Sequence, residues 1–255
     1  MKILGVIASR YASSRFPAKA LADILGKPMI WWVYQQSKKA KKLDKLLIAT
    51  DDERIVKICD KYEMPSIMTS SSHQTAANRL YEVSTKLNFD YYIQINGDEP
   101  LIDANLIDLV IPNEILQDFE FGSSLVAQMS EPSEVLDPSN IKVVFDENFN
   151  TLYMSRAPIP FPYKTLNFKY YKHIGIIGYN KKMLELYDKT QAGVTERIEG
   201  IDTLRFNDYG KIFKSIEAPD TKSISVDTPK DLQRVIQIIK EKFKRGELLD
   251  IKERL

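Results

Sequence analysis

The chain has 255 residues, of which 44% are hydrophobic, enough to build a substantial core. Its 36 Lys and Arg against 35 Asp and Glu leave a net charge of +1, which excludes an overall positive field that would attract nucleic acid or an anionic membrane. The first apolar run is too short for a signal peptide, and no stretch approaches 18 uncharged apolar residues. We therefore expect a cytoplasmic protein with no nucleic-acid or membrane partner.

The first half of the chain alternates short apolar runs with amphipathic stretches, which predicts a mainly parallel, twisted sheet flanked by helices in the α/β class. The predicted strands cover residues 2–7, 45–50, 65–69 and 91–95. The predicted helices lie near residues 28–41, 53–62, 76–87 and 103–116. The only cysteine, Cys59, falls near the apolar face of the second of these helices, so we expect it in the core rather than in a disulfide.

The middle of the chain is strand-rich, with short turns and the proline-rich stretch "APIPFPY", and this predicts a mixed-sheet insertion. Its strand-like segments are "SSLVAQMS", "IKVVFD", "TLYMSR" and "YKHIGIIGY". Two helices near residues 180–189 and 197–207 follow, then the strand "KIFKSIE" and a closing helix from about residue 228. We expect a single domain over residues 1–255, with a subdomain at about residues 120–210.

Three cations stand in the loop "ASRYASSRFPAK" that follows the first strand: Arg10, Arg15 and Lys19. In open α/β sheets, the loop after the first strand is a common phosphate site. The loop lacks both GxGxxG and GxxxxGK[ST], which excludes a dinucleotide fingerprint and a P-loop. Its arginines and lysine suit a bound phosphate, the alternative being a solvated basic turn.

Two acidic motifs lie elsewhere in the chain. The segment "QINGDEP" ends a predicted strand, and Asp98 there is a better Mg²⁺ ligand than Glu99, which precedes a proline. A turn-capping aspartate is the alternative for Asp98. The segment "SVDTPKDL" places Asp227 before a helix, where capping alone accounts for it.

Together these segments resemble the 3-deoxy-manno-octulosonate (Kdo) cytidylyltransferases, relatives of the CMP-sialate synthetases. The ordered matches include "RYASSRFPAKAL", "ATDDERI", "HQTAANRLYEV", "NGDEPLI", "DPSNIKVV", "HIGIIGY", "TERIEGIDTLR" and "VDTPKDL". The resemblance implies a nucleotide-diphospho-sugar transferase-like fold, CTP and an acidic sugar as substrates, Mg²⁺, and a homodimer formed through the 120–210 subdomain, which also binds the sugar.

The resemblance implies roles for particular residues. It assigns Asp98 and Asp227 to the metal, and Lys19 and Arg10 to the phosphates, with Arg15 as a further match. It also implies substrate contacts at seven other positions: His73, Arg79, Asn96, Arg156, His173, Glu196 and Glu199. For the two histidines, a hydrogen-bonded structural role is the alternative.

Several positions depart from the family pattern where it lines the base or sugar pocket. The family's Ser-Gly-Thr-Glu is Thr75 to Asn78 here, a glutamine is Asn96, and a Glu-Gln pair is Asp202 and Thr203; in the basic loop, a glycine is Ala18. Shorter polar side chains break direct hydrogen bonds, to which specificity is sensitive. The acceptor is therefore expected to be Kdo, a Kdo variant or another acidic sugar.

The resulting hypothesis is Mg²⁺-dependent attack of the anomeric hydroxyl of a 3-deoxy sugar acid on the α-phosphorus of CTP, releasing pyrophosphate for surface polysaccharide or lipopolysaccharide synthesis. The alternatives are a nucleotidyltransferase of the spore-coat-polysaccharide or acylneuraminate type, and a non-catalytic nucleotide-sugar sensor. Ala12 disfavours the former, whose members generally carry glycine there. Retention of Lys19, Asp98 and Asp227 disfavours the sensor.

Overall fold

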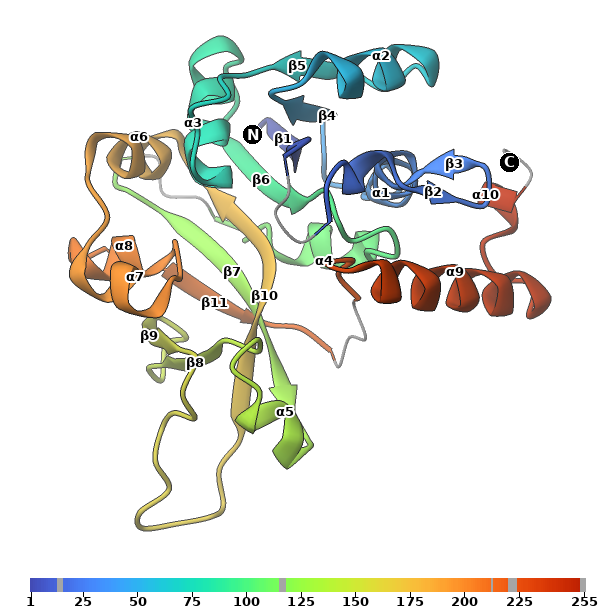
Figure 1. Ribbon diagram of the computed structural model, residues 1–255. Helices are drawn as coiled ribbons and strands as arrows, with labels where there is room; N and C mark the ends of the chain where they lie inside the picture. The colour runs from blue at the N-terminus through green and yellow to red at the C-terminus, as the bar shows by residue number, and fades with distance from the viewer. Residues whose placement is uncertain (13–15, 115–117, 212, 220–223, 253–255) are drawn as a thin grey trace.

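Parallel strands joined by crossover helices form the first half of the chain (Figure 1). The structure is a computed structural model that describes residues 1–12, 16–114, 118–211, 213–219 and 224–252. The elements of this half are β1 (Ile3–Ser9), η1 (Lys19–Leu21), β2 (Asp23–Ile24), β3 (Lys27–Pro28), α1 (Met29–Ser37), β4 (Lys45–Thr50), α2 (Glu53–Lys61), β5 (Ser66–Met68), α3 (Ala76–Lys86), β6 (Tyr91–Asn96) and α4 (Ala104–Leu109). The four predicted strands are confirmed, with β1 paired in parallel to both β4 and β6.

The second half adds strands to the same sheet. Its elements are β7 (Gly122–Met129), α5 (Pro132–Leu136), β8 (Lys142–Phe145), β9 (Thr151–Ser155), β10 (Tyr170–Tyr179), α6 (Lys181–Lys189), α7 (Val194–Glu199), α8 (Leu204–Asp208), β11 (Phe213–Glu217), α9 (Pro229–Lys244) and α10 (Leu249–Lys252). The strand order is β11-β7-β10-β6-β1-β4-β5, and β8 with β9 branches from β10. Because β10 runs antiparallel to β6, the mixed part extends the parallel sheet rather than forming a sheet of its own.

Three predicted helices differ in extent from those observed. The helix predicted near 28–41 spans only Met29–Ser37, and the other two differ for local reasons. The helix predicted over 103–116 ends at Leu109, because Ile111 precedes Pro112 and a residue before proline is disfavoured in a helix. The helix predicted over 197–207 is two helices. Gly200 adopts a left-handed φ of +63° that ends α7, and α8 begins only at Leu204.

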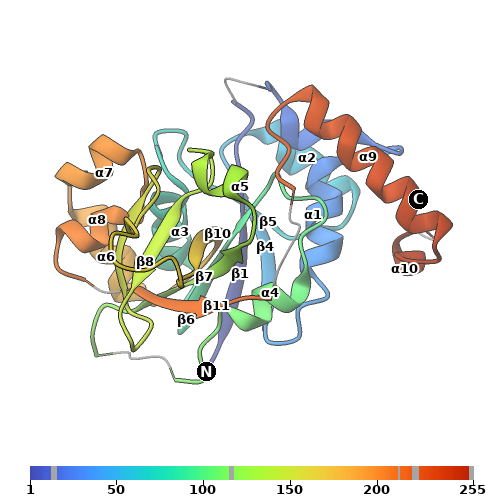
Figure 2. The ribbon, with the colours of Figure 1, turned by 90° about the horizontal axis from the view of Figure 1, so that it is seen from below.

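Apolar side chains cover both faces of the sheet. One core lies between the sheet and α1, α2, α4 and α9, and it includes Trp32, Ile55 and Cys59, all fully buried. The other lies between the sheet and α3 and α6, as Figure 2 shows from below. The burial of Cys59, expected from its helical face, is confirmed and raises the pKa of its thiol to about 11. Among the described residues, no helix is long and apolar enough to cross a membrane.

The topology brings distant segments to one edge of the sheet. Since β1, β4 and β6 are parallel, their carboxyl ends lie side by side, and the segments that follow them meet there. Two backbone hydrogen bonds join these segments: Gly97 N donates to Ala8 O at 3.2 Å, and Val226 N donates to Asp98 O at 2.8 Å. The second bond fixes the start of α9 beside the end of β6.

Candidate active site

A cleft with a volume of about 880 Å³ opens at this edge of the sheet. Its wall contains six of the residues that the sequence identified as site candidates: Arg10, Lys19, Arg79, Asn96, Asp98 and Asp227. They come from the loop after β1, the start of α3, the end of β6 and the turn before α9. The fold therefore gathers residues that are more than 200 positions apart in the chain.

An ammonium group shared by two carboxylates lies in the cleft. Lys19 Nζ donates to Asp98 Oδ2 at 2.6 Å, to Asp227 Oδ1 at 3.1 Å and to the backbone oxygen of Val226 at 3.2 Å. These side chains are partly exposed, Asp227 most at 34%. Burial by itself would lower the pKa of Lys19, but the two carboxylates outweigh it, and the pKa is raised above its usual 10.5.

The pair of carboxylates suits a hard divalent cation completed by ligands from a substrate. Their oxygens are close enough to share one cation, as the Lys19 contacts show. No group of three or more His, Cys, Asp or Glu able to hold a metal is found among the described residues. An ion that takes one or two protein carboxylates plus phosphate oxygens, as Mg²⁺ does, fits this donor set.

The other predicted phosphate contacts differ in how firmly they are held. Arg10 donates a long hydrogen bond of 3.4 Å to Gln74 O, a weak contact that a bound anion would readily replace. Arg15 lies outside the described residues.

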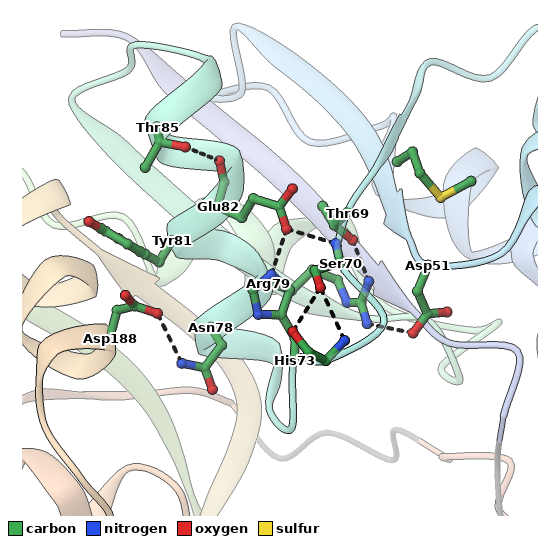
Figure 3. Close-up of polar contacts among 12 residues, drawn as sticks. Asp51, Thr69, Ser70, His73, Asn78, Arg79, Tyr81, Glu82, Thr85 and Asp188 are labelled. Carbon is green, nitrogen blue, oxygen red and sulfur yellow. Dashed lines mark hydrogen bonds and ion pairs between the residues drawn. The ribbon is translucent and has the colours of Figure 1, made fainter.

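Arg79 is held in the wall of the cleft by a buried ion pair. Its guanidinium, 1% exposed, donates to Asp51 Oδ2 at 2.8 Å and to the hydroxyl of Thr69, as Figure 3 shows. Arg79 therefore reaches the cleft as a fixed charge rather than as a mobile side chain.

His73 lies outside the cleft wall, beside α3. Its Nε2 is 2.6 Å from Glu82 Oε2, the carboxylate that also accepts from Ser70 N at 2.8 Å (Figure 3). This arrangement ties the segment before α3 to the helix. It matches the structural alternative for His73, and substrate binding by this residue stays a prediction.

Asn96 stands at the floor of the cleft, close to the backbone of β10. Its Nδ2 donates to Glu99 Oε1 at 3.1 Å, and Glu99 is buried. A Cβ at Gly175 would come within 2.4 Å of Asn96 Nδ2, so a larger residue there would displace the Asn96 amide from its present position. The bulge of β10 between Ile174 and Ile177 lies at this point.

Three further predicted residues are fixed by contacts among β9, α7 and α8, outside the cleft wall. Arg156 donates to the backbone oxygens of Pro138, Glu199 and Gly200, at 2.9, 2.8 and 3.2 Å. Glu199 accepts from Ser155 Oγ at 2.6 Å. Glu196 forms a buried, bidentate ion pair with Arg205, with both distances 2.7 Å. Substrate contacts by Arg156, Glu196 and Glu199 stay predictions.

His173 lies on β10 opposite Val126, and residues paired in this way share a face of the sheet. Val126 packs against Ile201 and Leu204, so the imidazole faces the turn between α7 and α8. Nδ1 of His173 is buried and has no hydrogen-bond partner among the described residues. Burial lowers the pKa of His173 to about 4, which keeps the ring neutral at pH 7.

Sequence reasoning missed Tyr11 in the cleft wall and the carboxylate of Asp51 behind it. Tyr11 belongs to the basic loop, where only the cations were considered. The motif "ATDDERI", at the carboxyl end of a predicted strand, was the available signal for Asp51, because that end faces the cleft.

Comparison with known proteins agrees with this geometry. A model of a family described as cytidylyltransferase matches residues 4–216. This chain belongs to the cytidylyltransferase family. A 3-deoxy-manno-octulosonate cytidylyltransferase of Fusobacterium nucleatum is 39% identical over 94% of this chain and 98% of the relative. An 8-amino-3,8-dideoxy-manno-octulosonate cytidylyltransferase of Shewanella piezotolerans is also 39% identical, over 91% and 96%.

Solved structures place this cytidylyltransferase in the same fold. A CMP:2-keto-3-deoxy-manno-octonic acid synthetase complexed with CTP superposes with a TM-score of 0.87 at 32% identity, over 95% of this chain and 100% of that one. An inositol-1-phosphate CTP transferase of T. maritima, at 14% identity and a TM-score of 0.65, shares the fold. The nucleotide-diphospho-sugar transferase-like fold expected from the sequence is therefore confirmed.

His173 provides a direct test of the burial of this part of β10. We expect its imidazole to stay neutral until the pH falls to about 4, whereas a histidine in an unfolded chain titrates near 6.5. Because the folded pKa lies below the unfolded one, His173 contributes stability that is complete above pH 6.5 and is lost as the pH falls to about 4. NMR titration of the two histidines, assigned with His73→Gln, measures this. A His173 signal that titrates near pH 6.5 would contradict the burial argument.

Proposed function

We propose that the protein transfers CMP from CTP to the anomeric hydroxyl of Kdo or a related 3-deoxy sugar acid, with release of pyrophosphate, for lipopolysaccharide biosynthesis. The observation that carries the proposal is the cleft at the ends of β1 and β6, where one cation, Lys19, is shared by Asp98 and Asp227. Full-length similarity to Kdo-type cytidylyltransferases supports the choice of CTP and acceptor.

In this proposal the residues of the cleft bind and orient, and none forms a covalent bond to the substrate. Arg10 and Lys19 bind the phosphates and offset the charge that collects on the leaving pyrophosphate. Asp98 and Asp227 would hold Mg²⁺, which when bound would supply charge neutralisation at the phosphates. The fixed charge of Arg79 and the amide of Asn96, both in the lining of the cleft, orient the nucleotide and sugar.

The acceptor's identity depends on the side of the cleft near Arg10 and the turn between α7 and α8. Asp202 in that turn reaches the surface, while desolvation by the protein around its carboxyl group and the charge of Glu196 raise its pKa against the opposing charges of Arg205 and Arg10. Relatives at equal identity act on Kdo and on its 8-amino analogue, according to their names. An exposed carboxylate at the acceptor end favours an amine-bearing sugar acid, since an ammonium group would be attracted to it.

A homodimer is the second part of the proposal. The segment between β9 and β10 projects from the body of the molecule in Figure 1 and carries Phe161, Tyr163 and Leu166, each more than 80% exposed. Beside its base lies a largely apolar groove of about 570 Å³, lined by Met129, Pro132, Val135, Leu136, Phe168 and Tyr170 among others. Two copies related by a two-fold axis would bury each arm in the partner's groove.

The first test of the function is pyrophosphate release from the four nucleoside triphosphates, with and without Mg²⁺. We expect release only with Mg²⁺ or Mn²⁺, and preferentially with CTP, because the chain matches this family over nearly its whole length. Kdo and 8-amino-3,8-dideoxy-manno-octulosonate are compared as acceptors. We expect Kdo to be the poorer one, because residues 76–78, 96 and 203 depart from the Kdo pattern. Equal turnover with all four nucleotides would contradict the CTP assignment.

Asp227→Asn separates metal binding from helix capping. We expect activity to fall about 100-fold or more, equivalent to roughly 2.7 kcal/mol of transition-state stabilisation, because a full charge leaves a site for a divalent cation. Thr228, not Asp227, accepts the capping hydrogen bond of α9 from Asp231 N, so the fold is expected to persist. Asp98→Asn is expected to lose activity to a similar extent. The loss of activity in the double variant is expected to be much smaller than the sum of the two single effects, because both carboxylates act on one ion.

Glu241→Gln is the matched control, since it removes one carboxylate from an exposed position of the same helix, outside the cleft wall. Rates are measured over a range of Mg²⁺ concentrations. Wild-type turnover of Asp227→Asn at limiting Mg²⁺ would show that Asp227 is not a ligand.

The dimer is tested by Leu166→Asp in the projecting arm. We expect this variant to elute as a monomer, because a charge placed in an apolar interface must be desolvated without a partner. Light scattering coupled to gel filtration gives the molar mass. Leu249→Asp is the control, since Leu249 is also exposed but lies on α10, far from the arm. A monomeric wild-type protein would refute the dimer.

A further inference from the structure

Two neighbouring carboxylates, Asp51 and Asp52, follow β4 at the edge of the sheet where the cleft opens. Neither takes part in the mechanism above. Each binds one arginine: Asp51 binds Arg79 at 2.8 Å, and Asp52 binds Arg54. The two ion pairs begin at adjacent residues but support different residues of the cleft wall. Asp51 holds Arg79, and the Asp52–Arg54 pair contacts Tyr11.

The ion pair between Asp52 and Arg54 contacts Tyr11, an aromatic residue of the cleft wall. Arg54 donates from Nε and NH2 to the two oxygens of Asp52, at 2.8 and 2.6 Å, which fixes the plane of the guanidinium. The guanidinium carbon lies 3.3 Å from the ring centroid of Tyr11, a close cation–π contact. Tyr11 lines the cleft, whereas Arg54 is 58% exposed and lies outside its wall.

Tyr11 lies at the first end of the basic loop that is proposed to bind phosphate. It follows Arg10 directly, and its backbone oxygen accepts from Ala18 N at 3.1 Å, which brings the two ends of the loop together. Ala18 has a left-handed φ of 57° and precedes Lys19. A ring held by Arg54 therefore sets the position of Arg10 on one side and, through Ala18, of Lys19 on the other.

The ion pair between Asp51 and Arg79 supports a different part of the cleft wall. Arg79 is 1% exposed, so its charge is kept in the cleft wall by the carboxylate of Asp51 and the hydroxyl of Thr69. A buried guanidinium without its carboxylate would be strongly unfavourable and would leave its present position. The Asp51 side chain thereby determines where Arg79 meets a ligand.

We infer that Asp51 and Asp52 are positioning residues for the nucleotide, Asp51 acting through Arg79 and Asp52 through Arg54 on Tyr11. The inference rests on the proposed function, in which this cleft binds CTP. It assigns a role to Arg54, a surface residue that sets the affinity for the nucleotide without touching it. It also explains why both acids occur together directly after β4.

The decisive experiment is a double-mutant cycle on Arg54 and Tyr11, read out as the dissociation constant for CTP by calorimetry without acceptor. We expect Arg54→Met and Tyr11→Leu each to weaken binding about fivefold, and the double variant no more than either alone, because both remove one cation–π contact. Because Tyr11→Phe keeps the ring, Arg54→Met is expected to weaken binding about fivefold in that background as well. The KM for the acceptor is expected to stay within about twofold of the wild type.

The structure offers a charge-matched control for each change. Lys57→Met removes a cation from the exposed face of the same helix, and Glu53→Gln removes an acid one residue beyond Asp52. Both are expected to bind CTP normally. Asp52→Asn keeps the cap of α2, because asparagine caps a helix as well as aspartate does. We therefore expect this variant to have an unchanged melting temperature. Its affinity for CTP is nevertheless expected to fall to that of Arg54→Met. Asp51→Asn is expected to weaken CTP binding about tenfold or more.

The outcomes separate this inference from the function on which it rests. If Tyr11→Leu and Arg79→Met bind CTP like the wild type, the proposed nucleotide site is wrong and the inference falls with it. Suppose that those two variants bind weakly but Arg54→Met binds CTP as tightly as the control Lys57→Met: positioning through Tyr11 is then overturned. It is also overturned if the losses of CTP affinity from Arg54→Met and Tyr11→Leu simply add in the double variant. Normal binding by Asp51→Asn overturns positioning through Arg79. Should Asp51→Asn fail to fold, the exposed Arg54 pair still decides the question.

Discussion

The sharing of the Lys19 ammonium between Asp98 and Asp227 is the interaction on which the active-site architecture depends. It joins the loop after β1, the end of β6 and the start of α9, three segments that have no local reason to meet. Two carboxylates this close would repel each other without a cation between them. The same charge balance that holds these segments together makes the cleft suitable for a cation and a polyphosphate.

Around this centre, charged side chains are used to hold the backbone as well as to face the ligand. Lys142 is fully buried, and its ammonium donates to the backbone oxygens of Asp137, Asn140 and Arg156. Arg156 in turn donates to the backbone oxygens of Glu199 and Gly200 at the end of α7, and to that of Pro138. Basic residues that resemble substrate contacts in the sequence thus fix irregular segments, where a strand ladder is not available to satisfy the backbone.

The division between the two ends of the cleft follows from this construction. The end proposed for the nucleotide is built on the parallel strands, whose register places the basic loop after β1 and Asp98 side by side. The end proposed for the acceptor is built on turns such as that carrying Asp202, which lies between α7 and α8, two helices joined by the buried ion pair of Glu196 with Arg205. Turns vary more readily than strands, so differences in acceptor are expected to arise at this end.

Sequence patterns were sufficient for the elements whose determinants are local. The strands at residues 45–50 and 91–95, the burial of Cys59 on its helical face and the grouping of basic and acidic motifs at one sheet edge all follow from periodicity and from the rule that parallel strands end together. Helix ends were predictable only in part, because a glycine such as Gly200 ends a helix only when it adopts positive φ.

The partners of long polar side chains were decided by the tertiary structure. His73 and Arg79 belong to one motif, yet His73 binds Glu82 outside the cleft and Arg79 lies in its wall, bound to Asp51. Nothing in the spacing of "HQTAANR" separates the two, since each side chain has several rotamers and several partners within reach. By itself the sequence determined the fold class, the family and the residue types of the site. Only the folded chain decided which charges meet, because ion pairs between distant segments depend on three-dimensional proximity rather than on order along the chain.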